Sequence, residues 1–205
     1  MGRFCAAPAP AKNTINPYRL TANAMDLNEV VEVIRGTVRN SSSRIATCAA
    51  ARVSCEGWLK VELLHALTLR FNDREDVELL PEKQHIDLVI SDRQEKILIE
   101  LKTFPCNYGA SGKPITNFIG GVIRDLEKLC PLRAKGTKCL AVWVAYAIPD
   151  TIPASWPRHL ARVRGVASVT HCVDVIPLWP GQNAHLHIME PLVADVTIAS
   201  QTLPL

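Results

Sequence analysis

Three residues of the types that handle metal ions and phosphates lie close together near the middle of the chain. Asp87 is followed, after twelve residues, by the tripeptide Glu100-Leu101-Lys102. Apolar stretches on either side of a polar segment around Arg93-Gln94 predict two strands joined as a tight hairpin. In that hairpin Asp87 faces Glu100, and Lys102 lies on the same face because side chains alternate along a strand. The pattern predicts that these three side chains gather within reach of one another.

Such a group is suited to the hydrolysis of phosphodiesters. Two adjacent carboxylates repel each other, and a divalent cation between them relieves the repulsion. Mg²⁺ prefers a few carboxylate oxygens together with waters and phosphate oxygens. A lysine beside the metal can orient or deprotonate a water, or neutralise charge on a phosphate in the transition state.

The other face of the predicted hairpin is apolar. Its members, all expected in the core, are Ile86, Leu88, Ile90, Ile97, Ile99 and Leu101.

The rest of the chain predicts elements that surround this hairpin. Helical periodicity covers 26–36, where Gly36 is expected to end the helix, and about 45–71, with Gly57 as a possible interruption. Residues 77–80 resemble a further strand, 116–129 a helix, 138–148 a strand buried on both faces, and 155–164 a basic helix. Three strand-like stretches follow near 166–176, 184–189 and 192–199. This order predicts an α/β or α+β fold with a mixed sheet between helices.

The Asp87…Glu100-Leu101-Lys102 pattern resembles the signature of the PD-(D/E)XK nuclease superfamily, which has the restriction-endonuclease-like fold. The similarity extends over residues ~45–148, whose predicted order matches that superfamily's αβββαβ core. The resemblance implies that Asp87 and Glu100 bind Mg²⁺ or Mn²⁺, with the carbonyl of Leu101 as an added ligand, and that Lys102 is the catalytic lysine. Ile86 stands where the motif's name has a proline, which many members lack.

In such enzymes an acid on the preceding helix often completes the metal site. Here that role falls on Glu62, and Glu56 is available in the same helix. The resemblance implies a metal-dependent endonuclease, with DNA favoured over RNA as the polymer. Cleavage of both strands of a duplex would require a homodimer, because one site cuts one strand. The alternative is a catalytically silent nucleic-acid-binding or interaction module on the same fold.

Charge is divided unevenly along the chain. Residues 74–100 carry four Lys or Arg and eight Asp or Glu, whereas 131–165 carry six Lys or Arg and one acid. An acidic centre beside a basic segment fits a site that holds cations and faces a polyanion. Weaker candidates for contacts with nucleic-acid phosphates are Lys113, Arg124, Lys128, Arg158, Arg162 and Arg164.

The 205 residues suit one domain, expected over 26–205 with a C-terminal extension from 149, after a poorly ordered basic arm at 1–25. No apolar run approaches the ~20 residues of a membrane helix, and no signal peptide is recognised at the N-terminus, so a cytoplasmic protein is predicted. The seven cysteines contain no C-x-x-C pair and are expected to be free thiols. His185 and His187, on one face of a predicted strand, are expected to be structural rather than metal-binding.

Overall fold

A computed structural model describes residues 25–83, 85–106, 115–133 and 137–193. The fold is α+β, with a six-stranded mixed sheet flanked by helices. The helices are α1 (Leu27–Asn40), α2 (Ser42–Ala51), α3 (Glu56–Phe71), α4 (Ile115–Arg133) and α5 (Trp156–Arg164). The strands are β1 (Glu78–Lys83), β2 (Ile86–Ser91), β3 (Lys96–Pro105), β4 (Lys138–Pro149), β5 (Ala167–Trp179) and β6 (Gln182–Pro191).

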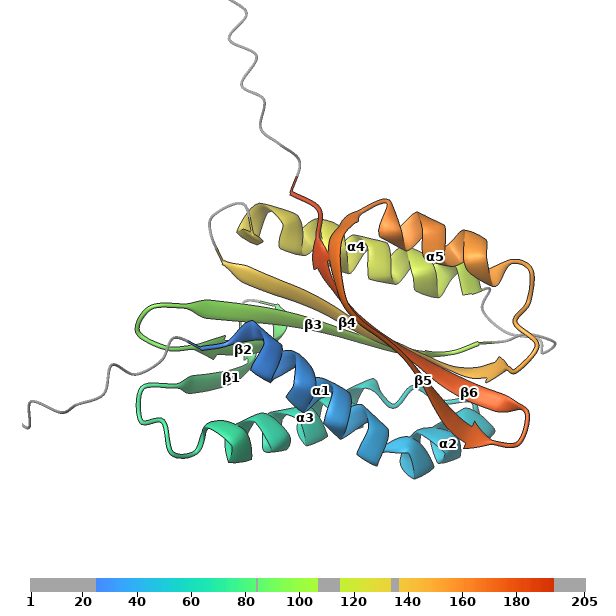
Figure 1. Cartoon of the computed structure of the whole chain (residues 1–205), viewed down its shortest axis with the longest axis horizontal. Helices are drawn as coiled ribbons and strands as arrows, with labels where there is room; N and C mark the ends of the chain where they lie inside the picture. Colours follow the sequence, from blue (N-terminus) through green and yellow to red (C-terminus); the bar gives the residue numbers. More distant parts are fainter. Residues whose placement is uncertain (1–24, 84, 107–114, 134–136, 194–205) are drawn as a thin grey trace, which may run out of the picture.

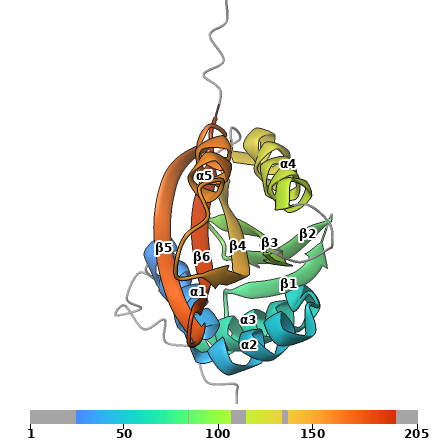
Figure 2. The ribbon, with the colours of Figure 1, turned by 90° about the vertical axis from the view of Figure 1, so that its right-hand side faces the viewer.

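The sheet separates two apolar cores. Helices α1, α2 and α3 cover one face, and α4 and α5 cover the other (Figures 1 and 2). The strand order is β1-β2-β3-β4-β6-β5. Strands β1, β2 and β3 form an antiparallel meander, and β4 lies parallel to β3 after the crossover through α4. The central strand β4 is buried on both faces because each face contributes to a separate core, as its continuous apolar run predicted.

The register of the β2–β3 hairpin is the predicted one. Val89 pairs with Leu98, and Ile90 pairs with Ile97. The prediction for Ile86 is wrong, because this side chain packs with Val89 and Leu98 in the core beneath α4 rather than with the other core. The chain enters β2 through His85 in a left-handed conformation, φ 65°, which disturbs the alternation at the first residue of the strand.

Two predicted helix boundaries are also wrong. Gly36 does not end α1, because the next turn buries Val38 completely, and this gain outweighs the roughly 1 kcal/mol cost of a glycine inside a helix. The predicted stretch 45–71 is broken before Gly57. Arg52, in the left-handed conformation with φ 56°, ends α2, and α3 begins at Glu56.

The segment after residue 149 belongs to the same sheet, since β6 pairs with β4. The strand predicted near 192–199 and the arm predicted at 1–25 lie almost entirely outside the described residues. In the part of the chain that the structure describes, no helix combines the length and apolarity needed to cross a membrane.

Candidate functional site

Asp87 and Glu100 meet where the β2–β3 ladder ends. The last pair of that ladder is Leu88 with Ile99. One step further, the Oδ2 of Asp87 accepts a hydrogen bond of 2.8 Å from the backbone N–H of Leu101. The Asp87 side chain thus replaces the next rung between the strands, which holds its carboxylate beside Glu100. The side chain of Glu100 is only 6% exposed.

Each of these carboxylates is paired with a lysine from a helix. The Nζ of Lys60, on α3, lies 2.7 Å from Oδ1 of Asp87 and also contacts Glu82. The Nζ of Lys128, on α4, contacts Oε1 of Glu100. The two lysines come from helices on opposite faces of the sheet, so the carboxylates lie in a charged region reached from both layers.

Lys102 is positioned by two further acids. Its Nζ lies 3.5 Å from Oε1 of Glu56 and 3.9 Å from Oδ2 of Asp125. The second oxygen of Glu56 accepts a 3.1 Å hydrogen bond from the backbone N–H of Thr103, which fixes the carboxylate against β3. The ammonium of Lys102 is therefore held between the start of α3 and the middle of α4.

The structure brings Glu56, rather than Glu62, to this site. Glu62 pairs with Arg44 of α2 at 2.8 Å. Residues in a helix rotate by about 100° each, so Glu62 points about 120° away from Glu56, whereas Lys60 lies within about 40° of it. The first turn of α3 therefore directs Glu56 and Lys60 to the strands and leaves Glu62 on another side of the helix.

The site holds more negative than positive charge. Burial, together with the nearby charges of Asp87 and Asp125, raises the pKa of Glu100 to about 7 despite the opposing effect of Lys128. Burial is also the main cause that raises the pKa of Asp125, to which Asp87 and Glu56 contribute. Burial acts to lower the pKa of Lys60, but its ion pairs with Asp87 and Glu82 raise it overall. A cation added between the carboxylates would relieve this repulsion.

The available donors are hard oxygen atoms. Among the described residues, no three His, Cys, Asp or Glu side chains are grouped so that they could hold a metal ion. A cation here would depend on Asp87, Glu100, the carbonyl of Leu101 and waters. This donor set fits Mg²⁺ or Mn²⁺, which tolerate few protein ligands and retain water.

Sequence reasoning missed Lys60 and Asp125 as parts of the site. Each lies one helical turn from another charged residue of the site, Lys60 from Glu56 and Asp125 from Lys128. Opposite charges at i, i+3 or i, i+4 were a usable signal. They did not indicate which helix face meets the strands, and only the packing of α3 and α4 decides that.

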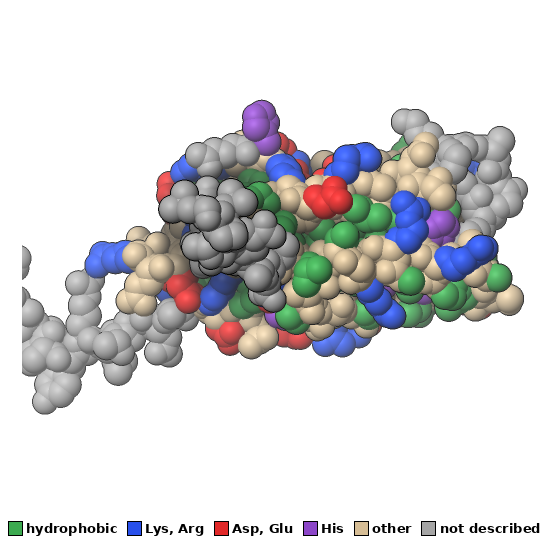
Figure 3. All heavy atoms as spheres, turned by 90° about the horizontal axis from the view of Figure 1, so that it is seen from above, with side chains coloured by type: hydrophobic (Ala, Val, Ile, Leu, Met, Phe, Trp, Pro, Cys, Tyr) green, Lys and Arg blue, Asp and Glu red, His purple; other side chains and the backbone are tan. Residues whose placement is uncertain are grey.

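The residues predicted to contact phosphates lie in different parts of the structure. Lys128 lies at the carboxylates, whereas Arg124 on α4 is exposed. Arg158, Arg162 and Arg164 are exposed on α5, which packs beside α4 on the same face of the sheet. Seen from that side, Lys and Arg side chains are spread over the surface with apolar side chains between them (Figure 3). Lys113 lies outside the described residues.

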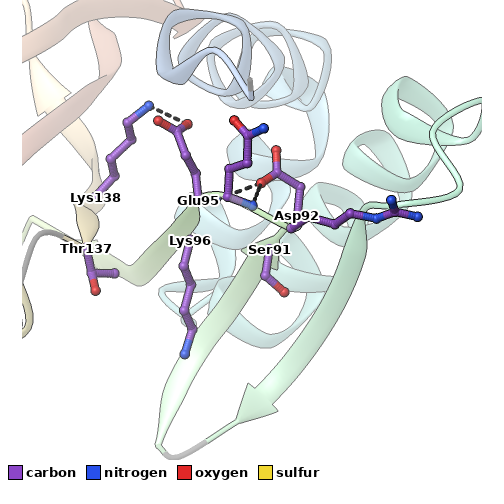
Figure 4. Close-up of a pocket in the computed structure, with 8 residues that line it drawn as sticks. Ser91, Asp92, Glu95, Lys96, Thr137 and Lys138 are labelled. Carbon is purple, nitrogen blue, oxygen red and sulfur yellow. Dashed lines mark hydrogen bonds and ion pairs between the residues drawn. The ribbon is translucent and has the colours of Figure 1, made fainter. Parts of the chain in front are cut away.

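A pocket lies at the tip of the β2–β3 hairpin (Figure 4). Two acids that line it, Asp92 and Glu95, have partners close by. Asp92 accepts hydrogen bonds from the backbone N–H groups of Gln94 and Glu95, at 2.8 and 2.7 Å, and Glu95 pairs with Lys138 at 2.7 Å. These contacts hold the turn, so we assign this pocket a structural role.

His185 and His187 do not form a metal site with other groups in the described parts of the chain. Both are buried on β6, and the ring of His187 stacks on Trp143.

Comparison with known proteins identifies no relative of this chain, because no family model, curated protein or solved structure matches it.

Proposed function

We propose that this protein is a Mg²⁺- or Mn²⁺-dependent nuclease that hydrolyses phosphodiester bonds, most readily in DNA. The observation that carries the proposal is the approach of Asp87 to Glu100 at the end of the β2–β3 ladder, with Lys102 paired to Asp125 beside them. Two carboxylates in a site with excess negative charge, one buried and one half-buried, together with a lysine held by two other acids, are groups suited to metal-assisted hydrolysis.

The connectivity supports membership of the restriction-endonuclease-like fold. Helix α3, the meander β1-β2-β3, helix α4 and strand β4 follow one another in the order αβββαβ. The parallel pairing of β3 with β4 agrees with a mixed sheet whose faces are covered by those two helices. We therefore propose that the elements from α3 to β4 form the part of the chain that resembles this fold. Strands β5 and β6 are then additions to the sheet.

In the proposed reaction the site's residues have separate roles. Asp87, Glu100 and the Leu101 carbonyl would hold the divalent ion, which supplies charge neutralisation at the phosphate when bound. Lys102 would orient the attacking water or donate a hydrogen bond to a phosphate oxygen. Glu56 and Asp125 position the Lys102 ammonium, so they act through that residue.

The substrate is proposed to be a nucleic acid because α5 carries exposed arginines on the same side of the sheet as Lys128. Arg158, Arg162 and Arg164 supply positive charge for the phosphate backbone on the face that α4 shares. Cleavage of both strands of a duplex requires two sites. We therefore propose that two copies of the chain form a homodimer on the substrate.

The test is cleavage of supercoiled plasmid, single-stranded DNA and RNA by the purified chain in Mg²⁺, in Mn²⁺ and in EDTA. We expect nicking that requires the metal and is absent from Asp87→Asn purified in the same way. Nucleic-acid binding without cleavage in any metal would instead favour a silent binding module. If the chain neither binds nor cleaves any of these nucleic acids, the proposal is overturned.

The proposed metal site should depend on pH through Glu100. Because burial raises the pKa of this carboxyl to about 7, it is increasingly protonated below that pH and then cannot bind a cation. We expect the affinity for Mn²⁺, measured by calorimetry, to fall about tenfold for each pH unit below 7 and to level off above 8. Equal affinities at pH 6 and pH 8 would contradict this assignment.

A further inference from the structure

Lysine ammonium groups already pair with the two carboxylates that the proposed function assigns to a metal ion. Lys60 contacts Asp87, and Lys128 contacts Glu100. A divalent cation that binds to the same carboxylate oxygens must share these oxygens with the ammonium groups or displace the ammonium groups. A cation and an ammonium in contact with one carboxylate lie only a few ångströms apart, where like charges repel strongly. The two lysines therefore compete with the metal.

The two lysines are held differently. Lys60 has two carboxylate partners, Asp87 and Glu82, and its side chain is only 17% exposed. Lys128 is 38% exposed and contacts Glu100 and the backbone carbonyl of His85. Within the described residues Glu100 is the only carboxylate that forms an ion pair with Lys128. Lys128 is thus the lysine that can leave with the loss of one ion pair rather than two, and it is the more exposed to solvent.

We propose that Lys128 is a displaceable counter-ion, which occupies Glu100 in the metal-free protein and is released towards solvent when a divalent cation binds. This inference rests on the proposed function, because it assigns a role at the same carboxylates. The released ammonium lies on α4, on the face that carries the exposed arginines of α5, and is then free to pair with an anionic substrate. Lys128 is a positioning residue in this scheme, since it acts by controlling access to Glu100.

The test is a calorimetric titration with Mn²⁺ alone at pH 8. Lys128→Met removes the competing charge and keeps an unbranched side chain, so it is expected to bind Mn²⁺ at least about tenfold more tightly than the unmodified chain. The matched control is Lys96→Met, which removes the same charge at the other end of β3, where no ion pair of Lys96 occurs among the described residues. The control is expected to change the affinity less than about twofold.

The outcomes separate the two proposals. If the unmodified chain binds Mn²⁺ and Lys128→Met binds it no more tightly, the counter-ion role is overturned and the metal site stands. If neither chain binds Mn²⁺, the proposed function fails, and the inference with it.

A second measurement on the unmodified chain does not depend on the folding of Lys128→Met. The side-chain Nζ resonance of Lys128 is assigned by its loss in Lys128→Arg. Its chemical shift is expected to change as Mg²⁺ is added, while the chemical shift of the Lys96 Nζ resonance remains constant. A Lys128 resonance unchanged at saturating Mg²⁺ would also overturn the counter-ion role.

Discussion

Asp87→Asn is expected to lower the rate of Mg²⁺-dependent cleavage by about a thousandfold or more. A metal ion contributes several kcal/mol of transition-state stabilisation, and each 1.4 kcal/mol corresponds to about a factor of ten in rate. The replacement removes one of the two carboxylates but retains an oxygen that can accept the hydrogen bond from the Leu101 N–H. Lys60 keeps its contact with Glu82. The fold should therefore survive the change.

Two measurements separate loss of chemistry from loss of structure. Cleavage rates are compared at saturating Mg²⁺, and the free energy of unfolding is measured by chemical denaturation. Asp73→Asn is the matched control, because Asp73 is an exposed acid in the turn after α3 and its replacement removes the same charge. If Asp87→Asn cleaves as fast as Asp73→Asn, then Asp87 does not hold the metal.

The hairpin could be predicted from sequence because its information is local. Alternation of apolar and polar residues determines which side chains share a face, and a short turn determines the register. The pairing of Val89 with Leu98 followed directly, and with it the approach of Asp87 to Glu100. Ile86 departs from the pattern because the left-handed residue before it breaks the alternation, and nothing in the apolar spacing reveals that turn.

The residues contributed by helices could not be predicted in the same way. The rotation of a helix about its axis is decided by the face that it buries, which depends on the sheet beneath it. In α3, buried Leu59, Leu63 and Leu67 determine that rotation, and it places Glu56 rather than Glu62 against β3. Two glutamates six residues apart look equivalent in sequence until this packing is known.

His187 is expected to make the fold sensitive to acid. Its ring is fully buried and stacks on Trp143 with a centroid distance of 3.8 Å, and neither ring nitrogen has a hydrogen-bond partner among the described residues. Burial, with smaller contributions from His185 and Arg164, lowers the pKa of His187 to about 3. The unfolded chain, with a histidine pKa near 6.5, binds a proton that the folded chain excludes. Stability must therefore fall as the pH falls from about 6.5 towards 3.

The size of this effect follows from the difference in pKa. Between pH 7 and pH 4 the free energy of unfolding is expected to decrease by about 3 kcal/mol through His187 alone. His187→Phe keeps an aromatic ring on Trp143 and removes both unpaired nitrogens, so this part of the pH dependence should vanish. The variant should also gain about 1 kcal/mol at pH 7, because two buried polar atoms without partners are lost.

Chemical denaturation at several pH values, with His65→Phe on the exposed side of α3 as the control, tests this expectation. Carboxylates such as Asp174, whose pKa is lowered by its ion pair with Arg39, also destabilise the protein in acid, but they do so equally in every variant. The difference between His187→Phe and His65→Phe in the slope of the free energy of unfolding against pH is thus specific to the buried ring. Equal slopes in the two variants would mean that the folded protein admits a proton at His187, and that the ring has access to water.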